Sequence, residues 1–224
     1  MERAAFGGLG GSMTAWKRAR RILLCVTGGI AAYKTPELVS RLRKLDCEVE
    51  IFMTRAAERL VSPLAFSTLS GRRVWRQDDF LSPEWGYEIP HVRVSDWAEV
   101  AVVAPCTANT ASDLAHGRGE SLVSAALLAA ACPVLLFPAM NEHMFEHPAT
   151  RRNLSVLSER GVRVVDPEFG VLACGCEGKG RLPAKPSELL QICCNKLYTY
   201  NIICNGFQAL IKLGLLPYSK VTPD

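Results

Sequence analysis

A short polar segment follows one of the apolar runs of this sequence. Residues 133–137 are apolar over the length of a buried parallel strand, and Pro138, Ala139, Met140 and Asn141 come directly after them. Ligands of open α/β sheets bind at the carboxyl ends of such strands. The amide of Asn141 can donate a hydrogen bond to a carboxylate and accept one from an amine. Asn141 is therefore a candidate for recognising a small carboxylic acid, and the alternative is that it only caps a helix.

A second candidate site is the turn Gly28-Gly29-Ile30-Ala31, which joins a predicted strand at residues 21–27 to a predicted helix. The free backbone N–H groups at the start of such a helix suit a phosphate. The turn lacks the G-x-G-x-x-G spacing, so it fits a mononucleotide better than a dinucleotide. The alternative is a glycine turn required only for tight packing.

Small and hydroxyl-bearing residues also follow the next two predicted strands. They are Thr54, Ser62, Pro105, Thr107, Ala108 and Asn109. The carboxyl ends of parallel strands share one edge of a sheet, so one crevice would hold these residues. Thr54 and Ser62 are weaker candidates, because hydroxyl residues at such positions more often cap helices.

His91 follows Pro90 just before the third predicted strand, and we expect it in an extended segment. An imidazole there could orient a substrate or move a proton. The alternative is a histidine of the surface or core without a catalytic role. Four histidines in the chain do not by themselves single out His91.

The elements that must position these residues alternate along the chain. Strands are predicted at residues 21–27, 49–54, 100–104, 133–137 and 162–165, and helices at 31–45, 56–69 and 122–131. This alternation predicts an α/β fold with a doubly wound parallel sheet and helices on both faces, in three αβα layers.

The two ends of the chain differ from this central part. Residues 1–19 read as an N-terminal extension with no secretory signal, so we expect a cytoplasmic protein. The glycine-rich and proline-rich residues 166–186 predict a functional flap, because they are too many for a simple connection. A closing helix is predicted at residues 187–197, and residues 198–224 form a tail without a clear period.

Composition excludes several other classes of protein. The net charge of +4 comes with no long basic run, so nucleic acid is not an expected partner, and no apolar run reaches the ~20 residues of a membrane span. Nine cysteines, several in apolar strands, favour reduced thiols. Cys174 and Cys176 have no second pair at zinc-finger spacing, so no metal site is expected.

Five motifs in this order resemble one family: TGGIAAYK, PHV, APCTANTASDLAHG, PAMNEHMF and LACGCEGKGRLP. They are similar to motifs of the homo-oligomeric flavin-containing cysteine decarboxylases, and most closely of the phosphopantothenoylcysteine decarboxylases of coenzyme A synthesis. The resemblance implies a flavodoxin-like domain at residues 20–197, bound FMN, and a homotrimer, or a multiple of trimers, with active sites between subunits. The candidate cofactor residues are then the Gly28 to Ala31 turn and the polar residues behind the second and third strands.

The resemblance also implies roles for single residues. His91 corresponds to the active-site histidine, and Asn141 to the asparagine that contacts the substrate carboxylate. Met144 also belongs to the expected substrate-binding residues. Cys174 corresponds to the cysteine of a substrate clamp at about residues 168–183, where Ala173 and Gly175 flank it. Phe145 replaces the usual tryptophan, and Cys176 stands where aspartate is common.

The implied reaction turns 4′-phosphopantothenoylcysteine into 4′-phosphopantetheine. FMN oxidises the thiol to a thioaldehyde, carbon dioxide leaves, and the ene-thiol is reduced again with Cys174 as proton donor. The alternatives are a decarboxylase of a peptidyl cysteine on a ribosomal precursor, a flavin prenyltransferase, and a non-enzymatic flavoprotein subunit. The clamp cysteine favours the coenzyme A reaction.

Overall fold

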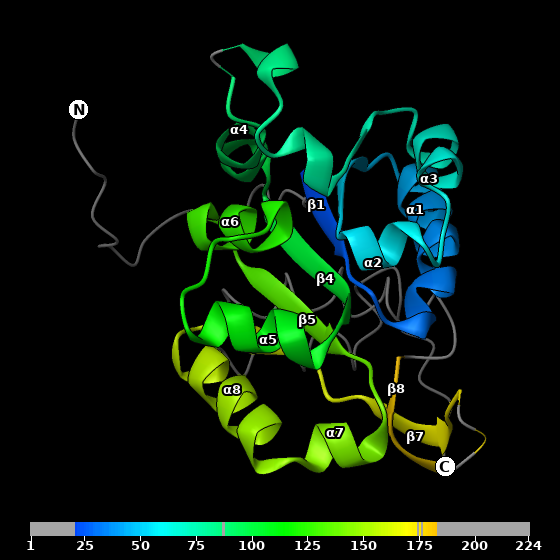
Figure 1. Cartoon of the computed structure of the whole chain (residues 1–224). Coiled ribbons are helices and arrows are strands. Elements are labelled where there is room, and N and C mark those ends of the chain that lie inside the picture. Colours follow the sequence, from blue (N-terminus) through cyan, green and yellow to red (C-terminus); the bar gives the residue numbers. More distant parts are fainter. Residues whose placement is uncertain (1–20, 87, 174, 176, 183–224) are drawn as a thin grey trace, which may run out of the picture. The chain divides into compact units, whose positions relative to one another are not determined.

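Six parallel strands form the centre of the fold. The structure is a computed structural model that describes residues 21–86, 88–173, 175 and 177–182 (Figure 1). The strand order in the sheet is β3-β2-β1-β4-β5-β6. The strands are β1 (Arg21–Val26), β2 (Glu48–Met53), β3 (Val74–Trp75), β4 (Val100–Cys106), β5 (Val134–Pro138) and β6 (Arg163–Val164). The predicted doubly wound α/β fold is confirmed.

Helices connect the strands and cover the sheet. The α-helices are α1 (Thr35–Lys44), α2 (Arg55–Glu58), α3 (Pro63–Ser70), α4 (Pro90–Trp97), α5 (Ala108–Ala115), α6 (Leu122–Ala129), α7 (Glu142–Glu146) and α8 (Pro148–Glu159). Three short 3-10 helices are η1 (Ile30–Lys34), η2 (Gln77–Asp79) and η3 (Pro83–Trp85). No described helix has the length and hydrophobicity that a bilayer span requires.

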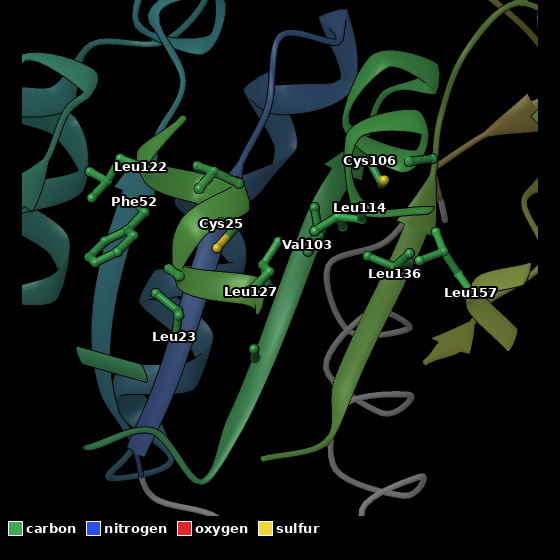
Figure 2. Close-up of a cluster of buried hydrophobic side chains, with 14 of the residues drawn as sticks. Leu23, Cys25, Phe52, Val103, Cys106, Leu114, Leu122, Leu127, Leu136 and Leu157 are labelled. Atoms are coloured by element: carbon green, nitrogen blue, oxygen red, sulfur yellow. The ribbon is translucent and has the colours of Figure 1, made fainter. Parts of the chain in front are cut away.

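The side chains of each central strand alternate between two packed faces. Leu23 and Cys25 of β1 belong to a buried cluster with α5, α6 and α8, to which Leu122 and Leu157 also contribute (Figure 2). Leu24, between them in the sequence, is equally buried but lies outside this cluster, because alternate residues of a strand point to opposite faces. The strands are therefore covered on both sides, which explains their continuous apolar runs.

The chain reverses its direction of winding at β1. β1 pairs with β2 on one side and with β4 on the other. The carboxyl ends of β1 and β4 therefore flank a topological switch point, where ligands of open α/β sheets bind. The residues that follow β1, β4 and β5 are the ones predicted to form a site.

The predicted helix at residues 56–69 is wrong, because two helices occupy this range. α2 ends at Glu58, and α3 begins at Pro63. Proline lacks the N–H group and suits the first turn of a helix but not its interior. The side chain of Ser62 accepts a hydrogen bond from Leu64 N–H and caps α3.

The expectation that His91 lies in an extended segment is also wrong. Pro90 is the first residue of α4, and His91 is the second. Proline preorganises the first position of a helix, so the same residue fits both interpretations until the structure distinguishes them.

An antiparallel hairpin lies within the predicted flap. Its strands are β7 (Glu168–Val171) and β8 (Glu177–Arg181). The hairpin places two glycines, Gly178 and Gly180, in buried positions of β8. The predicted helix at 187–197, like the two end segments, lies outside the described residues.

Candidate active site

The hydroxyl group of Thr27 joins the ends of β1 and β4. It donates a hydrogen bond to the carbonyl oxygen of Pro105 over 2.7 Å and accepts one from Thr107 N–H over 3.2 Å. Thr27 is fully buried, so neither bond competes with water. The turn after β1 and the loop after β4 are thereby held at a fixed separation.

The end of β5 lies against the same two segments. Ala139 N–H donates to the carbonyl oxygen of Cys106 over 3.1 Å. A Cβ atom placed on Gly29 would lie 3.3 Å from Cγ of Pro105 and 3.5 Å from the carbonyl oxygen of Ala139. Gly29 therefore sits where all three strand ends meet, and any larger residue there would crowd the other two.

Packing explains the glycine at position 28. A Cβ atom there would overlap the Cβ of Ala56, at the start of α2. Tight packing, the alternative to a phosphate-binding role, therefore explains why residue 28 is a glycine. The backbone of the turn still lies at the edge of the sheet. Ile30 and Ala31, which open η1, have N–H groups without an intrahelical acceptor, as at any helix start.

The hydroxyl residues behind β2 and β4 cap helices. Thr54 accepts a hydrogen bond from Ala57 N–H over 3.3 Å, and Thr107 accepts one from Thr110 N–H over 3.3 Å. Asn109 donates from its amide to the carboxylate of Asp113 over 2.9 Å. These caps fix the side chains at the edge, and Thr107 and Ala108 remain partly accessible.

Asn141 caps the first turn of α7. Its Oδ1 accepts a hydrogen bond from His143 N–H over 2.9 Å, so the cap interpretation is confirmed. The residue is also exposed at the end of β5, where its amide can serve a ligand. Met144 is half exposed, whereas Phe145 is buried under the guanidinium of Arg151, which lies 4.9 Å from the ring centre.

The β7–β8 hairpin docks onto the segment that carries Asn141. Met140 N–H donates to the carbonyl oxygen of Gly180 over 3.0 Å. The ammonium group of Lys34, on η1, donates to the carbonyl oxygen of Leu182 over 3.0 Å. Ala173 and Gly175 are exposed near the tip of this hairpin. Cys174 and Cys176, the other predicted clamp residues, lie outside the described residues.

His91 lies elsewhere. α4 is at the top of Figure 1, whereas α7 and the hairpin are at the bottom. The imidazole packs edge-on against Phe80, with the ring centres 5.1 Å apart. Its Nδ1 is buried without a hydrogen-bond partner among the described residues, and desolvation lowers the pKa of His91. Within one chain, the structure therefore joins Asn141 to the hairpin but leaves His91 apart.

The sequence interpretation missed Thr27 and Glu142. Thr27 carries the hydrogen bonds between β1 and β4, and Glu142 accepts a hydrogen bond from Lys179 N–H over 3.0 Å. Thr27 lies directly before Gly28 and Gly29, at the end of the predicted strand, so its sequence position gives no sign of a role in the site. The alternation Gly178-Lys179-Gly180 was the available signal for a close backbone contact in the flap.

The thiols of the sheet are not candidates for chemistry. Burial raises the pKa of Cys25 far above its usual range and that of Cys106 to about 12. Such thiols stay protonated and unreactive at neutral pH. Among the described residues, no three His, Cys, Asp or Glu side chains are grouped so that they could hold a metal ion.

Known proteins are similar to this chain in sequence and in architecture. The Flavoprotein family model matches residues 12–197. The coenzyme A biosynthesis bifunctional protein CoaBC of Bacillus subtilis is 43% identical over 173 residues, which are 77% of this chain and 42% of that protein. The chain thus spans less than half of the length of this curated relative.

Solved structures agree with the sequence comparison. A PPC decarboxylase mutant complexed with pantothenoylaminoethenethiol matches with a TM-score of 0.72 and 28% identity, over 82% of this chain and all of that chain. The FMN-dependent cysteine decarboxylase SpaF matches with a TM-score of 0.66 and 28% identity, over 80% and 97% of the two chains. The resemblance to flavin-containing cysteine decarboxylases is confirmed. Because the family model covers most of the chain, we conclude that this protein is a flavin-binding member of the Flavoprotein family.

Proposed function

We propose that this chain is an FMN-dependent decarboxylase that converts 4′-phosphopantothenoylcysteine into 4′-phosphopantetheine in coenzyme A synthesis. The observation that carries the proposal is the hydrogen bond between Met140 and Gly180. It attaches the hairpin that contains Cys174 to the strand end that carries Asn141. The bond joins β8, which follows Cys174 in the sequence, to the segment that carries Asn141, and this supports the proposal that both residues act on one substrate.

The residues at the sheet edge fit a flavin mononucleotide. Gly29 adds no side chain at the meeting point of the three strand ends, where Pro105 already lies. The residues assigned to FMN are Gly28, Gly29, Ile30, Ala31, Thr54, Ser62, Pro105, Thr107, Ala108 and Asn109. Backbone N–H groups and the helix-capping hydroxyls can donate hydrogen bonds to the acceptor atoms of a phosphate and of a flavin ring. When bound, FMN would supply the two-electron oxidation of the substrate thiol.

The residues of the chain would position the substrate for this chemistry. The amide of Asn141 would donate to the departing carboxylate, with Met144, Ala173 and Gly175 lining the substrate. The cap hydrogen bond from His143 N–H fixes the orientation of that amide. Cys174 would donate the last proton, and the hairpin would exclude water from the site.

We infer that a second copy of the chain completes the site, in a homotrimer. His91 lies far from Asn141 within one chain, and its buried Nδ1 has no partner among the described residues. Apolar side chains around α4 are exposed: Leu81 by 86%, Ile89 by 52% and Val92 by 39%. Such a surface fits an oligomer contact, which would bring the imidazole of one copy to the substrate of another.

Incubation of the purified protein with FMN and 4′-phosphopantothenoylcysteine tests the function. We expect absorption at about 370 and 450 nm and a product about 44 Da lighter than the substrate. No flavin absorption, or no mass change, would overturn the proposal. The similar protein SpaF is named only as a cysteine decarboxylase, so peptidyl cysteine is the second candidate substrate. A peptide product about 46 Da lighter, without turnover of the small molecule, would select it.

A further inference from the structure

Strand β8 is held to the segment after β5 by backbone groups and by one carboxylate. Next to the bond between Met140 and Gly180, Lys179 N–H donates to Oε1 of Glu142 over 3.0 Å. Glu142 is the first residue of α7 and is partly buried. Its carboxylate therefore satisfies a β8 backbone donor that a neighbouring strand would otherwise have to satisfy.

Two glycines leave room for this contact. A Cβ atom on Gly178 would lie 2.6 Å from Oε2 of Glu142 and 2.7 Å from its Cδ, and one on Gly180 would overlap the carbonyl oxygen of Met140. Both glycines are buried. The start of α7 and β8 can therefore approach more closely than any side chain at these positions would allow.

The contact does not depend on the charge of Lys179. Its ammonium group lies 3.9 Å from the carboxylate of Asp166 and 5.9 Å from the ring centre of Phe145. Glu142 instead receives the backbone N–H, so a glutamine at 142 can keep the acceptor oxygen whereas an alanine cannot. Glu146, one turn along α7, pairs with Arg151 at 3.6 Å and offers a matched residue for comparison.

We propose that Glu142 is a positioning residue that fixes the β7–β8 hairpin relative to Asn141, a role that rests on the proposed function. Glu142 follows Asn141 directly in the sequence, and its partner Lys179 lies five residues after Cys174. One carboxylate thus links the start of α7, next to the residue assigned to the substrate carboxylate, with β8, which follows the residue assigned to the last proton transfer. Small displacements between such groups lower rates strongly.

The test compares Glu142→Ala, Glu142→Gln and Glu146→Ala in the full chain with bound FMN. Under anaerobic conditions, mass spectrometry measures the ratio of the ene-thiol, about 2 Da lighter, to the saturated product. Hydrogen exchange of the peptide that spans residues 177–182 is measured on the same samples. Flavin absorption reports whether each variant keeps its cofactor.

We expect Glu142→Ala to retain flavin and decarboxylation while the share of ene-thiol rises roughly tenfold, with faster exchange at Lys179. Glu142→Gln should restore most of the saturated product, and Glu146→Ala should match the wild type. Unchanged exchange and an unchanged product ratio in Glu142→Ala would overturn the proposal, as would an equal effect of Glu146→Ala. Should the wild type not decarboxylate at all, the proposed function fails, and exchange alone decides whether Glu142 holds the hairpin.

Discussion

The hydroxyl of Thr27 lies 2.7 Å from the carbonyl oxygen of Pro105, across the switch point of the sheet. The hydroxyl oxygen of Thr27 also accepts a hydrogen bond from Thr107 N–H over 3.2 Å. One side-chain atom therefore joins two strands whose ends are far apart in the sequence, and the geometry of this edge of the sheet, the proposed flavin site, depends on it.

Replacing Thr27 by valine, which has the same shape without the hydroxyl, should destabilise the protein by about 1–3 kcal/mol, because a buried acceptor and a buried donor lose their partner. Flavin affinity should fall as well. Thermal unfolding and a flavin titration measure the two effects. Thr27→Ser, which keeps the hydroxyl, should stay close to the wild type in both, and an unaffected valine variant would show that the hydrogen bonds do not hold the edge together.

Asn141→Asp should abolish turnover while flavin stays bound. Aspartate is as good a helix cap as asparagine, so α7 should persist. Its charge would face the substrate carboxylate, and like charges repel strongly in a site of low dielectric. Steady-state kinetics and the visible spectrum check both statements. Turnover near the wild-type level would show that Asn141 only caps α7 and does not bind the substrate.

His91→Asn should keep flavin but lower decarboxylation by roughly 10²-fold or more. His116→Asn, at the exposed end of α5, serves as the control and should retain activity. If the site is shared between copies, co-expression of His91→Asn with Asn141→Asp should restore part of the activity, since some mixed oligomers contain an intact site. No recovery in mixed oligomers of demonstrated composition would argue against a shared site.

Cys174→Ser should release the ene-thiol in place of phosphopantetheine, because a serine hydroxyl is a far weaker acid than a thiol of pKa ~8.5. Mass spectrometry of the product, about 2 Da lighter, gives the result. Cys176→Ser is the matched variant. If only Cys176→Ser releases the ene-thiol, the proton donor is Cys176 and not Cys174.

The lowered pKa of His91 predicts a pH effect on stability. Desolvation favours the neutral imidazole in the folded chain, so on acidification the unfolded chain binds this proton first, near its ordinary pKa of 6.5. The free energy of unfolding should therefore fall as the pH drops through that value, and less so in His91→Asn. Urea unfolding at about pH 7.5 and 5.5 compares the two proteins. An equal pH dependence would mean that His91 is not desolvated.

Much of the sheet could be predicted from the sequence because buried parallel strands are continuous apolar runs. The predicted strand at residues 21–27 ends one residue after β1, and the predicted strand at 49–54 is shifted by one residue from β2. β3 escaped detection because it has two residues and pairs only at the sheet edge with β2. The prediction of one helix at 56–69 is wrong at Pro63 because the apolar residues on both sides of it keep a helical spacing.

The site was only partly predictable for a different reason. Strand ends can be identified from local sequence, and Asn141, Gly29 and Thr107 are predicted site residues for this reason. The role of Thr27 depends on Pro105, which lies 78 residues away, and that of Glu142 on Lys179, which lies 37 residues away. Such pairs require the fold itself, because no local pattern specifies which distant backbone group a side chain will meet.

The attachment of β8 places few demands on the side chains in the rest of the hairpin. Its attachment uses backbone amides, a backbone carbonyl and the absence of side chains at Gly178 and Gly180, whereas Phe169 and Val171 on the opposite strand are 67% and 58% exposed. Substitutions at these outward residues alter the surface that an incoming molecule meets without altering the attachment. We therefore expect that substitutions in the hairpin can change selectivity while the sheet and the proposed flavin site stay unchanged.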